Sequence, residues 1–326
     1  MAVAGATMAA MNGSEPRRRP THLTAVAAAL VVTFLWSSSW VLIRWGLDDE
    51  ALEPLTFAAL RYGLAALVLV AWVGGRRSLR DEVRSIDRSM VAGLVVLGVV
   101  FYAATQGAQF VAIAHQPAAT SSIVLSWTPL LVALVAARAL AEPPSARQVV
   151  GSLLVVAGAW LYFAGDLGAT TVGMVAAIVG LGSNVAASLL GRAVNRRADL
   201  SPVVVTAVSM AVGAVVLVAV GVVTEGVPSM SARAWIIVGW LAVVNTAFAF
   251  TLWNLSLRRL SAVESAAINN TMLIQIGVLA WIFLDERLGP VEIVGMAAVS
   301  IGVFAAQTAS ASRSQRAESG AGTAQR

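Results

Sequence analysis

Ten apolar stretches of about 20 residues each constrain the fold of this chain more than any other feature. About 20 apolar residues in a helix cross the roughly 30 Å of hydrocarbon in a bilayer. A segment in lipid must satisfy its own backbone, so helices are expected, and the alternation typical of a membrane barrel is missing. We therefore predict an all-α membrane protein with ten transmembrane helices, near residues 23–45, 54–74, 90–112, 117–140, 147–165, 169–190, 202–224, 233–254, 262–284 and 289–307.

The composition excludes several other classes of protein. Of the 326 residues, 58% are hydrophobic and 12% are charged, whereas a soluble domain carries about 25% charged residues. Because the chain has no cysteine and two histidines, we expect neither a metal site nor a cofactor. The net charge is +5, but the arginines are scattered over short loops, so nucleic acid is not an expected partner.

The arginines also predict how the chain lies in the membrane. Of the 22 basic residues, all arginine, two (Arg233 and Arg287) fall in outer loops and two (Arg44 and Arg61) in helices if the N-terminus is cytosolic. The other 18 (22 − 4) are then on the cytosolic side, where membrane proteins accumulate arginine. We expect a multi-pass protein of the cytoplasmic membrane with both termini in the cytosol. Disordered tails are predicted at 1–21 and 308–326.

The sequence contains an internal repeat at a constant offset of 144 residues. The segment LAEPPSARQVVG at 140–151 matches LDERLGPVEIVG at 284–295, and Gly158 matches Gly302. Each half, 22–165 and 166–307, holds five predicted helices, so the second half enters the membrane from the opposite face. Two inverted five-helix repeats are therefore expected, a plan that is common among secondary transporters.

Several degenerate motifs follow one another in a specific order. They are LWSSSW at 35–40 with Pro54 and Arg61, AATSSIVLSWTPLLVAL at 118–134, SAVESAAINNTMLIQIGVLAWIFLDE at 261–286, and Glu142 and Glu286 near the ends of the fourth and ninth helices. With these motifs the chain resembles the EamA-like ten-helix family of the drug/metabolite transporter superfamily. The resemblance covers nearly the whole chain except the tails and implies transport of a small metabolite without ATP. One departure is Leu273, where the first repeat has the helix-kinking Pro129.

Polar residues of the ninth predicted helix are candidates for a binding site. Unpaired polar groups in lipid are costly and therefore face the interior of a helix bundle. Glu264, Thr271 and Gln275 are spaced i, i+7 and i+11, which places them on one helix face. We expect a polar stripe that runs inward from the cytosolic end.

The third and eighth predicted helices carry a second set of candidates. Tyr102, Gln106 and Gln109 share one face of the third helix, and their partners at the offset of 144 are Thr246, Phe250 and Trp253. Pseudo-symmetry would aim both faces at one central cavity, where an amide wall opposite an aromatic wall suits an amphipathic small molecule. The alternative is that these groups only hold helices together.

The first helix adds Trp36 and Ser39, with close helix packing as the alternative reading. The predicted substrate-binding residues are therefore Trp36, Ser39, Tyr102, Gln106, Gln109, Thr246, Trp253, Glu264, Thr271 and Gln275.

Glu264 is the carboxylate that lies within a predicted span. If it is buried, it could couple transport to protons or recognise a cationic group. The alternative is a carboxylate at a helix N-terminus, favoured by the helix dipole and close to Arg258 and Arg259.

Three further charged residues have expected structural roles. Arg61 is expected to snorkel to the outer surface or to pair with Glu50 or Glu53, with a substrate carboxylate as the other possible partner. Glu142 and Glu286 are expected to cap a helix start or to bind loop amides, and not to bind substrate.

The leading hypothesis is a secondary transporter that moves a small metabolite by alternating access around a central cavity, with export as the favoured direction. Amino acids and amphipathic compounds are the candidate substrates, protons are a candidate coupling ion, and a monomer can enclose such a cavity. One alternative is a lipid-modifying enzyme, but the predicted spans hold neither paired carboxylates nor a histidine in a core position. The other is a sensor without transport, although the two tails at 1–21 and 308–326 are expected to be too short to fold into an extramembrane domain.

Overall fold

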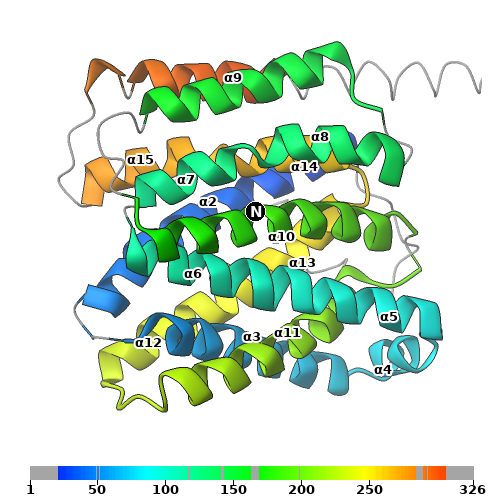
Figure 1. Cartoon of the computed structure of the whole chain (residues 1–326). Helices are drawn as coiled ribbons and strands as arrows, with labels where there is room; N and C mark the ends of the chain where they lie inside the picture. The colour runs from blue at the N-terminus through cyan, green and yellow to red at the C-terminus, as the bar shows by residue number, and fades with distance from the viewer. Residues whose placement is uncertain are drawn as a thin grey trace, which may run out of the picture.

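The computed structural model describes residues 21–305 except 49, 51, 117, 141–142, 163–168, 198, 284–288 and 292. Within these residues every regular element is a helix, and the helices run side by side in one bundle (Figure 1). In chain order they are α2 (His22–Asp48), α3 (Pro54–Gly74), α4 (Arg77–Arg84), α5 (Arg88–Leu97), η1 (Gly98–Thr105), α6 (Gln106–His115), α7 (Ala118–Ser126), α8 (Thr128–Ala139), α9 (Ala146–Tyr162), α10 (Thr171–Arg197), α11 (Pro202–Thr224), α12 (Ala232–Ala242), η2 (Val243–Phe248), α13 (Ala249–Ser256), α14 (Ala262–Asn269), α15 (Met272–Phe283) and a last helix at Ile293–Ala305.

Each predicted apolar stretch forms a helical rod, four of which are built from two or three consecutive elements. These composite rods are α5–η1–α6, α7–α8, α12–η2–α13 and α14–α15. Six of the rods are long and apolar enough to cross a membrane by length and composition. Large apolar side chains such as Val215 and Ile236 point outward, 69% and 72% exposed, as expected of a surface that lipid covers. The prediction of an all-α membrane protein is confirmed.

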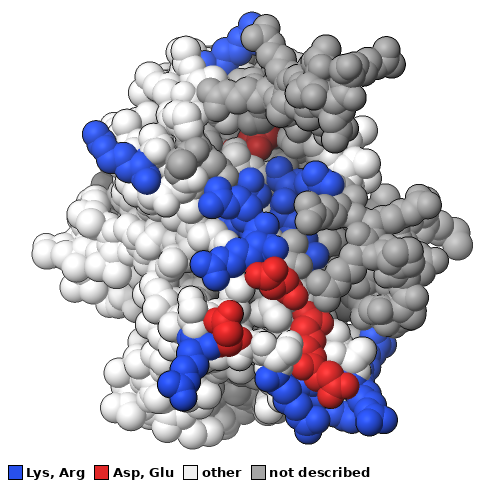
Figure 2. All heavy atoms as spheres, turned by 90° about the vertical axis from the view of Figure 1, so that its right-hand side faces the viewer, with Lys and Arg blue, Asp and Glu red and all other residues white. Residues whose placement is uncertain are grey.

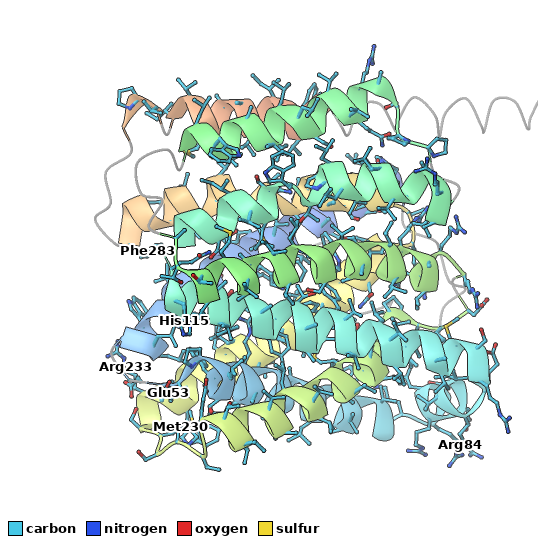
Figure 3. The ribbon with its side chains drawn as sticks, in the orientation of Figure 1. Glu53, Arg84, His115, Met230, Arg233 and Phe283 are labelled. Carbon is cyan, nitrogen blue, oxygen red and sulfur yellow. The ribbon has the colours of Figure 1, made fainter. Side chains whose placement is uncertain are left out.

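The two ends of the bundle carry its polar loops. Glu53, His115 and Arg233 lie at one end, and Arg84 lies at the other (Figure 3). Seen from the end with Arg84, arginine and acidic side chains gather over the face of the molecule (Figure 2). We call this the basic end. It collects the loops that the sequence assigns to the cytosol.

The short helix α4 at the basic end was not predicted. Its sequence, RSLRDEVR, is too polar to read as a span. Leu79 is nevertheless buried, 4% exposed, and Glu82 accepts a hydrogen bond from the backbone N–H of Ser201 at the start of α11. The amphipathic α4 therefore docks against the bundle.

Helices α3 and α11 pack against each other as an antiparallel pair. Each begins with a proline, Pro54 or Pro202, and in neither does the N-cap side chain cap the helix. Instead Glu225, just after α11, accepts hydrogen bonds from the backbone N–H groups of Leu55 (3.1 Å) and Thr56 (2.7 Å). Glu82, in α4 just after α3, accepts one hydrogen bond, from the backbone N–H of Ser201, the residue before α11. Each helix start is thus bound by a glutamate that lies beyond the end of its partner.

The glycines shared by the two halves meet between α9 and the last helix. A Cβ atom added to Gly158 would lie 2.7 Å from the carbonyl oxygen of Gly295, and one added to Gly302 would lie 2.5 Å from that of Gly151. Because 158 and 302, like 151 and 295, differ by 144, the two contacts are the same contact seen from either repeat. This reciprocity is what a two-fold relation between the repeats requires.

The repeats also share a π-helix. Adding 144 to η1, 98–105, gives 242–249, which coincides with η2 at 243–248. Such segments are rare and cluster at functional sites. In η1 the Thr105 hydroxyl donates to the Val100 carbonyl, five residues earlier, at 2.8 Å. Nothing in the apolar sequence distinguished these turns from ordinary α-helix.

The fourth and ninth rods break at equivalent places. The break between α7 and α8 is at Trp127, just before Pro129, and the break between α14 and α15 is at Asn270 and Thr271. The ninth rod has Leu273 in place of proline, so another cause is needed. Asn270 Nδ2 donates to the Ala266 carbonyl (3.1 Å) and Thr271 Oγ1 to that of Ile268 (2.7 Å), and such side-chain bonds compete with helical ones.

Glu142, Glu286 and the predicted disordered tails, apart from residue 21, lie outside the described residues.

Candidate functional site

Thr271 and Gln275 form a polar contact between the ninth and first rods. Gln275 accepts a hydrogen bond from Ser37 Oγ (2.9 Å) and donates to Thr33 Oγ1 (3.1 Å), while Thr271 Oγ1 lies 3.3 Å from Thr33 Oγ1. Two residues of the predicted stripe therefore share a face, which points at α2. Nothing in the sequence identified Thr33 and Ser37 as their partners.

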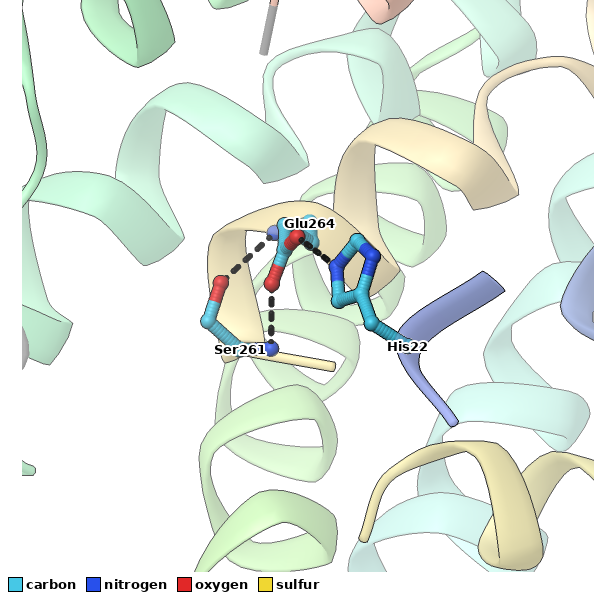
Figure 4. A network of polar contacts seen from close by, with 3 residues as sticks. All are labelled: His22, Ser261 and Glu264. Carbon is cyan, nitrogen blue, oxygen red and sulfur yellow. Dashed lines mark hydrogen bonds and ion pairs between the residues drawn. The ribbon is translucent and has the colours of Figure 1, made fainter. Parts of the chain in front are cut away.

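Glu264, the third residue of that stripe, lies at the start of α14. It accepts from the Ser261 backbone N–H (2.8 Å), and Ser261 Oγ accepts from the Glu264 N–H (3.2 Å), which completes a capping box. The ring of His22, the first residue of α2, lies 2.8 Å from the same carboxylate (Figure 4). Glu264 is therefore both buried, 2% exposed, and close to a helix N-terminus. Nothing in the sequence pointed to His22 as its partner.

The faces predicted for the third and eighth rods do meet. The rings of Tyr102 and Phe250 are 5.0 Å apart, and Tyr62 from α3 donates its hydroxyl to Gln106 Oε1 at 2.6 Å. We call the contacting aromatic side chains the ring cluster: Trp36, Tyr62, Phe101, Tyr102, Phe250 and Trp253.

Trp36 connects the first rod to this cluster. Its ring lies 4.7 Å from that of Phe250 and 5.2 Å from that of Trp253. Ser39 donates its hydroxyl to the Trp36 carbonyl at 2.5 Å, so its hydrogen bond stays within α2. Gln109 is half-buried.

The two structural roles expected for Arg61, snorkelling and pairing with Glu50 or Glu53, are wrong. Arg61 does not reach the outer surface, because its side chain is buried and the residue is 4% exposed. Its Nε donates to Thr246 Oγ1 (2.7 Å) and its Nη2 to the Asn245 carbonyl (3.4 Å), both in η2. Glu50 instead contacts Ser231 and Arg233. The rotation of α3 turns Arg61 toward the eighth rod, which one helix's own sequence does not reveal.

Three buried polar atoms in the ring cluster or beside Arg61 have no hydrogen-bond partner in the described part of the chain. They are Asn245 Oδ1, Trp36 Nε1 and Tyr102 Oη. The Asn245 amide nitrogen, in contrast, donates to Ser38 Oγ (3.2 Å) and to the Leu35 carbonyl. Buried polar atoms are normally paired, so these atoms could pair with a bound molecule.

The first, second, third and eighth rods therefore bring a cation, unpaired polar atoms and aromatic rings together at the interface of the two repeats. Comparison with known proteins identifies the family. The model of the EamA-like transporter family matches residues 23–164 and again 172–307. The chain belongs to this family.

Two curated relatives are also transporters by name. A probable terminal-alkyne amino-acid exporter of Streptantibioticus cattleyicolor is 30% identical over 135 residues, which is 41% of this chain and 43% of that protein. The uncharacterized transporter YyaM of Bacillus subtilis is 24% identical over 262 residues, 74% of this chain and 82% of that protein. A solved crystal structure aligns with a TM-score of 0.69 at 18% identity, over 88% of this chain and 98% of that one, which shows the fold alone.

These matches confirm the resemblance to the drug/metabolite transporter superfamily. The protein is a multi-pass membrane protein of a transporter family, with the ten-helix fold of that family.

Proposed function

We propose that the protein is a secondary transporter that exports a small amphipathic metabolite across the cytoplasmic membrane by alternating access. The observation that carries the proposal is the meeting of polar and aromatic side chains from both repeats around Arg61, Thr246 and the ring cluster. Sites at the interface of inverted repeats are the places around which such transporters rock. Substrate-binding roles are proposed for Trp36, Tyr102, Gln106, Thr246 and Trp253.

The remaining predicted residues have narrower proposed roles. Thr271 and Gln275 would be exposed to substrate when the first and ninth rods separate, because their bonds to Thr33 and Ser37 cross that interface. Ser39 and Gln109 are proposed to border the same path.

Amino acids are the candidate substrates that we favour. One relative is named as an amino-acid exporter, and an amphipathic zwitterion suits a site with both charged and aromatic groups. We further propose that a single chain suffices for transport, that the basic end faces the cytosol and that no enzymatic step is involved.

The proposal is tested by reconstitution into liposomes. A thermal-shift screen of metabolites on purified protein selects ligands, and flux of each ligand is then measured. Protein-dependent flux that needs no ATP is expected. Chemical modification of the liposome lipid without solute movement would instead favour a lipid-modifying enzyme. Ligand binding without solute flux would favour a sensor.

Coupling to protons is proposed for Glu264. The carboxylate and the His22 ring are 2.8 Å apart, and histidine is the side chain that changes charge near neutral pH. We expect Glu264→Gln to abolish the dependence of flux on an imposed pH gradient, measured in proteoliposomes. Ser261→Ala, which removes the capping hydroxyl but keeps the carboxylate, is the control and should retain this dependence. If flux in E264Q kept its dependence on the pH gradient, Glu264 would not be the residue that couples transport to protons.

A further inference from the structure

Arg61 is a buried cation in a membrane-spanning helix, the eighth residue of α3. It is 4% exposed, and no carboxylate among the described residues lies within ion-pair distance of it. A charged side chain inside a bilayer is costly and normally pairs with an opposite charge. The buried charge of Arg61 therefore lacks an anionic partner among the described residues.

The bonds that Arg61 makes are to neutral groups. Thr246 Oγ1 and the Asn245 carbonyl use two of its donors, and a guanidinium has about five N–H donors in a fixed fork. These two bonds hold the side chain against η2 and fix its direction. They do not neutralise the charge, and they leave the other N–H donors of the guanidinium available.

The unpaired acceptor beside Arg61 belongs to the same residue that holds it. Asn245 accepts from Arg61 through its backbone carbonyl, while its side-chain Oδ1 is buried without a donor. Trp36 Nε1 is a buried donor without an acceptor, and its ring lies in the ring cluster. Two independent kinds of unmet polar group, a charge and hydrogen-bonding atoms, thus occur in one place.

An apolar surface adjoins this polar group. The Arg61 Cζ atom lies 5.4 Å from the centre of the Tyr62 ring, and Tyr62 contacts Phe250 at 6.0 Å. Phe250 follows Thr246 by one turn of the eighth rod, so the rings continue from the cation along this rod. A ligand with a carboxylate at one end and an apolar body at the other matches this order.

We propose that Arg61 binds the carboxylate of the transported substrate and that the ring cluster binds its apolar body. The inference rests on the proposed transport function and names the substrate class: carboxylic acids with an apolar or aromatic body. Arginine suits the role because its planar fork binds a carboxylate through two parallel hydrogen bonds. The residue equivalent to Arg61 in the second repeat is not a cation: it is Val205 at the offset of 144 (61 + 144), or Ser209 if Pro54 is aligned with Pro202 (61 + 148). The repeats therefore build one such cation site and not two.

The experiment compares acids with their amides. Phenylalanine, leucine and 3-phenylpropanoate are each paired with the corresponding carboxamide, and affinities for the purified protein are measured by thermal-shift titration. The wild-type protein should prefer the acid by roughly 10- to 100-fold, because a hydrogen bond to a charged group contributes about 1.5–3 kcal/mol. Arg61→Gln should bring the ratio close to one.

Arg138→Gln is the matched control, because it removes the same charge from an exposed position at the end of α8 and should leave the ratio unchanged. If R61Q does not fold, Arg61→Lys replaces it. A lysine keeps the charge without the fork, so the ratio should still fall.

The inference is overturned if no acid binds better than its amide to the wild-type protein. It is also overturned if R61Q, or R61K in its place, keeps the wild-type ratio, since a purely structural arginine would weaken acid and amide alike. The proposed function fails differently: acids would bind, with the ratio dependent on Arg61, but no solute would cross the proteoliposome membrane.

Discussion

The Tyr62 hydroxyl, 2.6 Å from Gln106 Oε1, joins α3 to α6 inside the bundle. Tyr62→Phe keeps the ring and its contact with Phe250 but leaves the amide oxygen without this donor. We expect a loss of about 0.5–1.5 kcal/mol in the free energy of unfolding, the net contribution of a typical intramolecular hydrogen bond, since Gln106 is half-buried. Thermal or denaturant unfolding of the protein in detergent measures it.

A double-mutant cycle separates this hydrogen bond from a change in packing. With Gln106→Leu the acceptor is gone, so adding Tyr62→Phe should cost less than it does in the wild-type background. Strictly additive losses would show that the two side chains do not interact.

At the residue scale, the sequence predicted directions within one helix better than partners across helices. Tyr102 and Phe250 were placed on facing walls by the offset of 144, and their rings are in contact. The predicted partners of Arg61, Glu50 and Glu53, were wrong. They were chosen because they are its nearest acids in sequence, and sequence distance does not determine how α3 is rotated in the bundle. His22 was missed as the partner of Glu264 because it is 242 residues away.

At the scale of elements, the reciprocal caps of α3 and α11 are the feature most open to test. Glu225 accepts from two backbone N–H groups at the start of α3, where the helix dipole also favours a negative charge. Glu225→Ala should lower the free energy of unfolding by about 1–3 kcal/mol, measured by unfolding in detergent.

Glu53→Ala is the control for Glu225. Glu53 is an exposed carboxylate at the same helix start, and its side chain makes no capping bond. A surface substitution of this kind changes stability by about 0.5 kcal/mol or less. Equal losses in both variants would show that the cap from Glu225 contributes nothing specific.

The sequence predicted the helical rods, which follow from apolar composition alone. It did not predict the π-helices or the break in the ninth rod, which depend on local backbone geometry. Ten apolar runs predict ten rods because lipid leaves the backbone no alternative to a helix. The π-helices η1 and η2 were not predictable, since their sequences, GVVFYAAT and VVNTAF, contain no residue pattern that separates a π-helix from an α-helix. The same holds for the break at Asn270, which depends on side-chain bonds to the backbone.

For the whole molecule, the offset of 144 connects sequence and fold. The Gly158–Gly295 and Gly302–Gly151 contacts, the two π-helices and the breaks at Trp127 and Thr271 all obey it. The charged residues are not repeated in the sequence: at this offset Arg61 aligns with Val205 (61 + 144), His22 with Asp166 (22 + 144) and Glu264 with Thr120 (264 − 144). The scaffold is therefore nearly two-fold, whereas the charges that would recognise a substrate or a proton are asymmetric.

The orientation of this scaffold is testable because the chain has no cysteine of its own. Ser78 near Arg84 and Ser229 beside Met230 are exposed, and those neighbours lie at opposite ends of the bundle (Figure 3). We expect a membrane-impermeant thiol reagent to label Ser229→Cys in intact cells and Ser78→Cys only after permeabilisation, because arginine-rich loops stay in the cytosol. The reverse pattern would place the basic end outside. Labelling of both positions from one side would contradict the membrane-spanning bundle itself, since α3 and α11 would then not cross the bilayer.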